Sequence, residues 1–162
     1  MYYEGGAAHA GGKIALRPEM QRPGLSTQQD LNAYFATASL PDRLQERAEK
    51  LGFAIPVEST AGDVAARLMV SPATIASGEL LIRDPEIFES FQGIHDKALV
   101  AEMEAYGVFD ACEKQNVPVL VVRGISDYGD TTKDNTFHRV ASEAAAIVAL
   151  DYATHGWSRR AI

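Results

Sequence analysis

The sequence lacks the cysteines that a disulfide-stabilised protein needs. Cys112 is the single cysteine among 162 residues, so no disulfide can form within the chain. No apolar run is long enough to cross a bilayer, and no basic stretch followed by an apolar segment opens the chain as in a signal peptide. These absences predict a soluble protein of a reducing, cytoplasmic setting.

An excess of basic residues is also missing. The chain has 15 Lys and Arg against 22 Asp and Glu, and this formal net charge of −7 opposes binding to a nucleic-acid backbone. Its 46% hydrophobic and 23% charged residues are typical of a folded globular domain. We therefore expect a small-molecule ligand, with neither a nucleic acid nor a membrane as partner.

Metal-binding and phosphate-loop patterns are scarce as well. The glycines near the N-terminus are not followed by the Lys-Ser/Thr pair of a phosphate-binding loop. We expect no cofactor, and we expect no metal site because the four histidines lack ligand spacing. They stand at His9, His95, His138 and His155.

The chain opens in an unusual way for a complete fold. Residues 1–6 read MYYEGG, like a strand that continues into a glycine-rich loop. We therefore expect residues 1–162 to form one domain that is incomplete at its N-terminal edge. An unpaired strand edge there would favour a homo-oligomer. Glycine and proline in residues 4–24 predict a long surface loop or a short hairpin.

Apolar periodicity predicts strands and helices along the rest of the chain. Residues 26–52 have helical spacing that is interrupted near Pro41, with Gly52 placed to end a helix, which predicts two short helices or one broken helix. Further strands are expected at residues 53–57, 65–75, 98–102 and 117–125, and further helices at residues 85–91, 103–114 and 137–156.

Residues 117–125 (VPVLVVRGI) carry the clearest strand pattern. Nearly continuous apolar character is typical of a parallel strand that is covered on both faces. Together with the order of strands and helices, it predicts an α/β fold, a mainly parallel or mixed sheet flanked by helices. Ligands of such sheets bind beyond the carboxyl ends of the strands, so polar residues there are the first candidates for function.

Two polar groups follow predicted strands. Glu102 and Glu104 flank Met103 where a strand passes into a helix, and strand alternation would place both carboxylates on one side. Ser126 and Asp127 follow the most apolar strand. Each group also has a structural interpretation. An acidic pair can stabilise the positive end of a helix, and an aspartate after a strand can cap a helix or form a turn.

Three motifs occur in the order and approximate spacing of the nucleoside phosphorylase/nucleosidase superfamily. They are SGE at residues 77–79, AEMEA at residues 101–105 and RGISD at residues 123–127. Over nearly its whole length, the chain resembles the branch that includes methylthioadenosine/S-adenosylhomocysteine nucleosidase. The resemblance implies cleavage of the N-glycosidic bond of a purine nucleoside or nucleotide. The reaction would be hydrolysis, or phosphorolysis with phosphate as the second ligand.

The resemblance also implies roles for individual residues. Asp127 would donate a proton to N7 of the leaving purine, which requires a raised pKa, and Ser126 would orient its carboxylate. Glu104 would bind the ribose hydroxyls and favour the oxocarbenium-like sugar, on which Met103 would pack. The remaining substrate-binding residues would be Ser77, Leu81, Ile82 and Glu102, with Leu81 and Ile82 lining the purine.

The chain departs from the family pattern in several places. Leu81 stands where an aromatic ring often stacks on the base, which favours a purine in general over adenine alone, and Glu79 replaces the usual aspartate. The family's glycine-rich phosphate segment and water-activating acid have no counterpart in residues 1–162. The alternative function is therefore a catalytically inactive nucleoside-binding or assembly module of a larger signalling or defence protein.

Overall fold

The structure is a computed structural model that describes residues 6–8, 14–16, 21–53, 68–78, 98–127 and 137–157. The chain divides into two compact units, and each is described by itself. Unit 1 comprises Met1–Gly24, Pro72–Val121 and Asp127–Lys133. Unit 2 comprises Leu25–Ser71, Val122–Ser126 and Asp134–Ile162.

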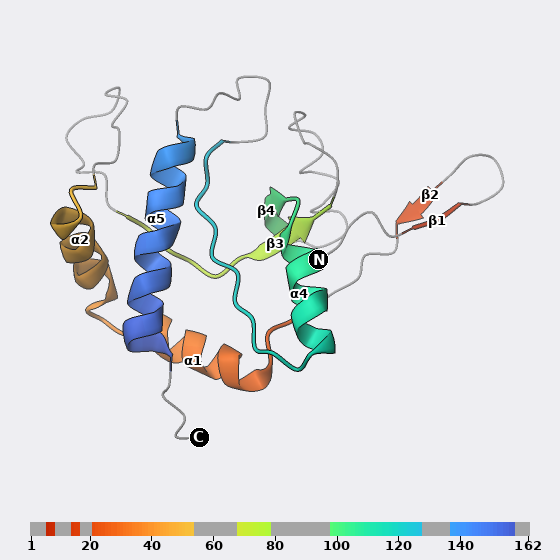
Figure 1. Ribbon diagram of the computed structural model, residues 1–162, viewed down its shortest axis with the longest axis horizontal. Coiled ribbons are helices and arrows are strands. Elements are labelled where there is room, and N and C mark those ends of the chain that lie inside the picture. The colour runs from red at the N-terminus through yellow and green to blue at the C-terminus, as the bar shows by residue number, and fades with distance from the viewer. Residues whose placement is uncertain are drawn as a thin grey trace. The chain divides into compact units, whose positions relative to one another are not determined.

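Unit 1 contains a short hairpin and a parallel pair of strands (Figure 1). β1 (Gly6–Ala8) pairs antiparallel with β2 (Ile14–Leu16), so residues 4–24 contain the hairpin that was one of the two predicted alternatives. β3 (Thr74–Ser77) pairs in parallel with β4 (Ala98–Glu102), and β4 has the bounds that the sequence predicts.

α4 (Ala105–Lys114) follows β4 and packs against β3. Small side chains lie at the centre of this unit, because Ala76 and Ala98 are 0% and 1% exposed. The helix ends in a left-handed residue, Asn116, at φ 53°, a conformation that asparagine tolerates well. The parallel strands and their flanking helix confirm the predicted α/β class.

The strand predicted at residues 117–125 is absent from the structure. Residues 117–127 lie outside any strand, and none of them is buried. Val117 and Ile125 are 51% and 57% exposed, so the expected cover on both faces is also wrong. The physical reason is that an apolar run can tolerate burial, but it becomes a strand only where neighbouring backbones complete its hydrogen-bond ladder.

The other predicted strands and helices of this region are only partly described. The strand predicted at residues 65–75 overlaps β3 at its end alone, since residues 68–73 lie in no strand. Of the strand predicted at residues 53–57, the structure describes only Phe53, which lies in no strand. The helix predicted at residues 85–91 lies outside the described residues.

Unit 2 begins with two short helices, as the sequence predicts. α1 (Leu25–Phe35) and α2 (Leu40–Lys50) are separated by a turn. Pro41 stands in the first turn of α2, where its missing N–H group needs no helical partner. Gly52 has φ 65° just beyond α2, which is the left-handed conformation that commonly ends helices.

The helix predicted at residues 137–156 is confirmed with one irregularity. α5 (His138–Asp151) continues into a single π-helical turn, η1 (Tyr152–Gly156). The aromatic ring of Tyr152 packs edge-on against that of Tyr34, with the ring centroids 5.2 Å apart. Among the described helices, none is long and apolar enough to cross a lipid bilayer.

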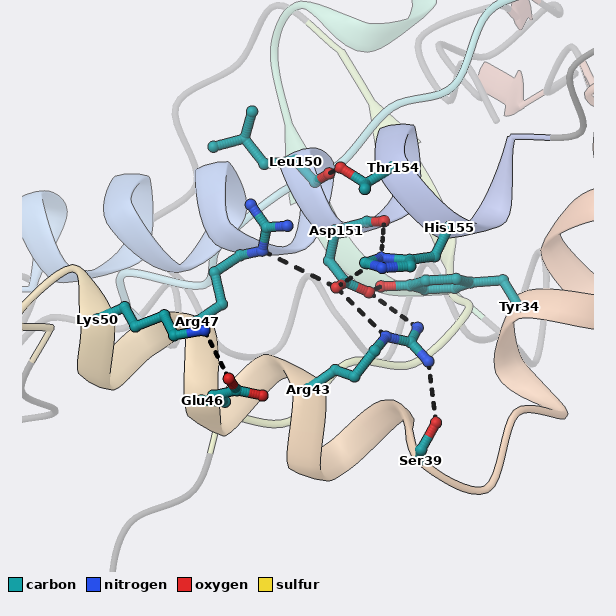
Figure 2. Close-up of polar contacts among 10 residues, drawn as sticks. All are labelled: Tyr34, Ser39, Arg43, Glu46, Arg47, Lys50, Leu150, Asp151, Thr154 and His155. Carbon is teal, nitrogen blue, oxygen red and sulfur yellow. Dashed lines mark hydrogen bonds and ion pairs between the residues drawn. The ribbon is translucent and has the colours of Figure 1, made fainter.

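A buried carboxylate joins the helices of unit 2, as Figure 2 shows. Asp151 is 1% exposed and accepts hydrogen bonds from the Tyr34 hydroxyl at 2.9 Å and from Nη2 of Arg43 at 3.0 Å. Nε of Arg47 and Nδ1 of His155 lie 3.9 Å and 3.1 Å from its Oδ1 atom. We call these five residues the Asp151 cluster. They link α1, α2 and η1 to the end of α5.

The partners of Asp151 determine its ionisation. Burial by itself raises the pKa of the carboxyl, but the hydrogen bonds from Arg43 and Tyr34 and the nearby positive charges outweigh burial and lower the pKa below its usual value. Burial and the same carboxylate raise the pKa of the Tyr34 phenol, which therefore remains a hydrogen-bond donor. The cluster thus contains an ionised aspartate at neutral pH.

We predict that Asp151→Asn lowers the free energy of unfolding by about 3 kcal/mol, near the lower end of the range for breaking a buried ion pair, because Arg43 keeps 21% of its side chain exposed. A carboxyl with a lowered pKa stabilises the fold above its usual pKa and loses that contribution as pH falls through the lowered value. The difference in unfolding free energy between the unmodified protein and Asp151→Asn should therefore shrink below about pH 4. Urea unfolding across pH measures it.

The matched control is Glu143→Gln, which removes the carboxylate from an ion pair with Arg139 on the surface of α5. The two side chains are 43% and 88% exposed, so the change should cost at most about 1 kcal/mol. Equal losses for the Asp151 and Glu143 variants would contradict a stabilising role for the Asp151 cluster.

The segment at residues 122–126 packs closely against α5 at Gly124. A Cβ atom built on Gly124 would lie 2.8 Å from Cα of Ala141 and closer still to its carbonyl group. Because these neighbours are backbone atoms of a helix, they have little freedom to move away. The absence of a side chain at Gly124 is therefore a packing requirement.

We predict that Gly124→Ala destabilises the protein by about 1–3 kcal/mol, the usual cost of overpacking, and lowers the melting temperature. Gly107→Ala is the control, because Gly107 lies inside α4 with nothing within 4 Å of the added Cβ. Alanine there should stabilise the helix by roughly 0.5–1 kcal/mol. Thermal unfolding of both variants measures these changes. A Gly124→Ala protein as stable as the unmodified one would refute the close packing.

Candidate functional site

Most of the predicted site residues of unit 1 lie where β3 and β4 end and α4 begins. Ser77 and Glu102 are the last residues of the two strands and are direct partners in the parallel register. The Gly78 N–H donates to the Glu102 carbonyl oxygen at 3.0 Å and continues the pairing. Met103 and Glu104 form the bend between β4 and α4.

The carboxylate of Glu102 caps the start of α4. Its Oε2 atom accepts hydrogen bonds from the backbone N–H groups of Glu104 and Ala105, both at 2.8 Å. The first N–H groups of a helix have no partner within the helix, and the positive end of the helix favours a negative charge. The structural interpretation of the acidic pair therefore holds for Glu102.

Ser77 supplies a second cap from the neighbouring strand. Ser77 is buried, with 3% of the residue exposed, and its Oγ atom accepts a hydrogen bond from the Tyr106 N–H at 3.1 Å. The serine and the glutamate thus bind three successive N–H groups at the start of α4. This arrangement fixes the bend between strand and helix.

Glu104 occupies the cap position of α4 through its backbone, at φ −121° and ψ −28°, but its side chain makes no cap hydrogen bond. The residue is exposed, and Met103 beside it is 46% exposed. Strand alternation does not extend to these residues, because β4 ends at Glu102. The two glutamates of the motif therefore have different surroundings.

Ser126 and Asp127 are neighbours in the sequence that belong to different units. Ser126 belongs to unit 2, whereas Asp127 belongs to unit 1 together with Glu102 and Glu104. Both are partly buried. The prediction that Asp127 directly follows a buried strand is wrong, because the preceding residues form no strand.

The predicted purine-lining residues, Leu81 and Ile82, lie outside the described residues. Within the part of the chain that the structure describes, no group of three or more His, Cys, Asp or Glu residues has the geometry of a metal site. Cys112, on α4, is a free thiol of intermediate exposure.

The Asp151 cluster was not among the predicted groups. Tyr34 and Arg43 are 117 and 108 positions from Asp151, so no local motif links them. The one available signal is that Asp151 lies four residues after the buried Ile147 and hence on the apolar face of α5. An acidic residue on such a face predicts buried partners without identifying them.

Comparison with known proteins agrees with these motifs and this fold. Residues 3–153 match the family described as the Phosphorylase superfamily. The chain is 64% identical over 159 residues to ATP nucleosidase Cap17 of Escherichia coli (strain KTE188), an alignment that covers 98% of this chain and 32% of the relative. It is 29% identical over 120 residues to 5'-methylthioadenosine/S-adenosylhomocysteine nucleosidase of Haemophilus influenzae (strain 86-028NP), which covers 72% of this chain and 46% of that protein.

The α/β fold, the three motifs and the family match over residues 3–153 together identify the family of this chain. The chain belongs to the phosphorylase superfamily. It spans about a third of the length of the two Cap17 proteins that it matches. No solved structure is significantly similar to the chain.

Proposed function

We propose that the protein cleaves the N-glycosidic bond of a purine nucleotide by hydrolysis, with ATP as the first substrate to test. Two observations support this choice of substrate and reaction. The relative at 64% identity is named an ATP nucleosidase, and the more distant relatives are also named nucleosidases. Phosphorolysis, the other reaction of the resemblance, has no support among these names.

The reaction requires opposite charges to be stabilised at two places. The bond between C1′ and the base nitrogen breaks, its electron pair leaves with the purine, and the ribose gains positive charge. Water then adds at C1′ and releases a proton, which balances the proton that the departing base takes up. A proton donor near N7 neutralises the departing base, and a carboxylate beside the ribose favours the cationic sugar. In this proposal Asp127 donates the proton, Ser126 orients the carboxyl group of Asp127, and Glu104 binds the ribose hydroxyls.

The observation that carries the proposal is the different use of the two glutamates. Glu102 caps α4 with its side chain, whereas the Glu104 side chain takes no part in the cap. Glu104 follows the carboxyl end of a parallel strand, which is the usual ligand-binding edge of an α/β sheet. Met103 is exposed beside it and offers an apolar surface to the sugar.

A cytoplasmic, homo-oligomeric protein is part of the same proposal. Leu99, on β4, is 61% exposed, and an exposed apolar side chain on a strand favours association with another copy of the chain.

We predict that Glu104→Gln weakens nucleoside binding about ten-fold or more, because it replaces charge-assisted hydrogen bonds by neutral ones. The fold should lose less than about 1 kcal/mol, the limit for a carboxylate that acts only through the helix dipole. Isothermal titration with adenosine and ATP measures the affinity. Glu113→Gln, an exposed change at the other end of α4, is the control. Unchanged affinity with a sharp fall in melting temperature would show that Glu104 is structural.

We predict that Asp127→Asn lowers the rate of adenine release from ATP by roughly 10²- to 10⁴-fold, the usual contribution of a general acid, and changes affinity much less. Chromatography of the released base, from the protein encoded by the complete reading frame that contains these residues, measures the rate. Asp110→Asn, which removes a surface carboxylate paired with Lys114, is the control and should leave the rate unchanged.

Three outcomes of this assay differ in meaning. Adenine release that depends on Asp127 supports the proposed enzyme. Equal rates for the unmodified protein and Asp127→Asn would remove Asp127 as the general acid. Nucleotide binding without base release would instead favour the inactive nucleoside-binding module.

A further inference from the structure

We propose that Glu102 and Ser77 are positioning residues that act on the substrate through Glu104. This inference rests on the proposed function, because it assumes that Glu104 binds the ribose. It replaces the direct substrate contacts that the resemblance implies for Glu102 and Ser77. The observation that supports it is the joint capping of α4 by two residues that are partners across the β3–β4 ladder.

The first step of the argument is that the cap includes the backbone of Glu104 itself. One of the two hydrogen bonds to Oε2 of Glu102 comes from the Glu104 N–H, and the other comes from Ala105. The orientation of the Glu104 peptide is therefore fixed by a side chain two residues earlier. A carboxylate must be held to within about 0.5 Å to bind a ligand productively, and a fixed backbone is the first requirement.

The second step is that Ser77 fixes the same bend from an independent segment. Its hydroxyl accepts the Tyr106 N–H, one position beyond the groups that Glu102 binds. Ser77 is separated from Tyr106 by 29 residues, so this bond links two distant parts of the sequence at one helix end. The near-complete burial of Ser77 protects the bond from competition with water.

The third step is that the two residues divide the work. Glu102 binds the N–H groups of Glu104 and Ala105, and Ser77 binds only that of Tyr106. Loss of the Glu102 side chain should free the backbone of Glu104, the residue that binds the ribose in the proposed function. Loss of Ser77 should loosen the helix behind it. The two substitutions therefore have different local signatures, although both should weaken nucleoside binding.

The test combines amide hydrogen exchange with nucleoside titration. Glu102→Ala should speed exchange of the Glu104 and Ala105 amides, and Ser77→Ala that of the Tyr106 amide, each by about ten-fold as expected for a lost cap. Adenosine affinity should fall by a similar factor in both. Ser77→Thr keeps the hydroxyl oxygen and should restore binding. Asp110→Asn, on the same helix, should change neither measurement.

A double-substitution cycle separates positioning from general stability. If Glu102 acts through Glu104, then Glu102→Ala should cost much less affinity in a Glu104→Gln background than in the unmodified protein. Glu102→Gln retains an acceptor oxygen without the charge and serves if Glu102→Ala does not fold. Additive losses, or faster exchange with unchanged affinity, would overturn the positioning role.

The same data separate this inference from the proposed function. If Glu104→Gln weakens adenosine binding and Glu102→Ala does not, the positioning role alone fails. If the unmodified protein binds no nucleoside, or if Glu104→Gln binds it equally well, the proposed function fails and the inference fails with it.

Discussion

A helix that begins soon after a parallel strand has several backbone N–H groups without partners in the helix. In unit 1, side chains at the ends of β3 and β4 bind these groups at the start of α4. Glu102 and Ser77 bind three of these groups from the ends of two adjacent strands. The cap requires the strands to be in register, because Ser77 and Glu102 reach α4 together only as cross-strand partners. The sheet, the bend and the helix therefore depend on the same few hydrogen bonds.

Unit 2 meets a different need with a different carboxylate. Asp151 is almost fully buried, and four side chains from three other segments surround it. A helix end offers partial charges, whereas Arg43 and Arg47 offer full ones. This contrast explains why Asp151 tolerates deep burial, while Glu102 lies at the edge of a sheet. In both units the acidic group orients neighbouring segments.

Local pattern predicted much of this structure where local forces decide it. The bounds of β4 and the break between α1 and α2 follow from alternation, from Pro41 and from Gly52, all of which act within a few residues. The strand expected at residues 117–125 failed because its existence depends on a neighbouring backbone, which an apolar pattern does not specify.

The site shows the same limit more sharply. The sequence identified both glutamates of the motif, but it did not determine which one caps the helix, because that depends on the residue at which the strand stops. β4 ends at Glu102, and a strand one residue longer would have changed the position of both side chains relative to α4. The partners of Asp151 on α1 and α2 could not be found from local patterns, since Tyr34 and Arg43 lie more than a hundred positions from Asp151.

Charge gives a physical reason for separating the roles of the two glutamates. In a chain with a net charge of −7, each carboxylate near a binding site adds to the repulsion of an anionic nucleotide. The charge of Glu102 is offset by the positive end of α4, to which it is hydrogen-bonded. In the proposed function, Glu104, whose side chain makes no cap hydrogen bond, is the carboxylate that faces the cationic sugar. In that proposal, such a site would favour the positively charged transition state over the neutral ribose of the bound substrate, which is the requirement for accelerating the cleavage.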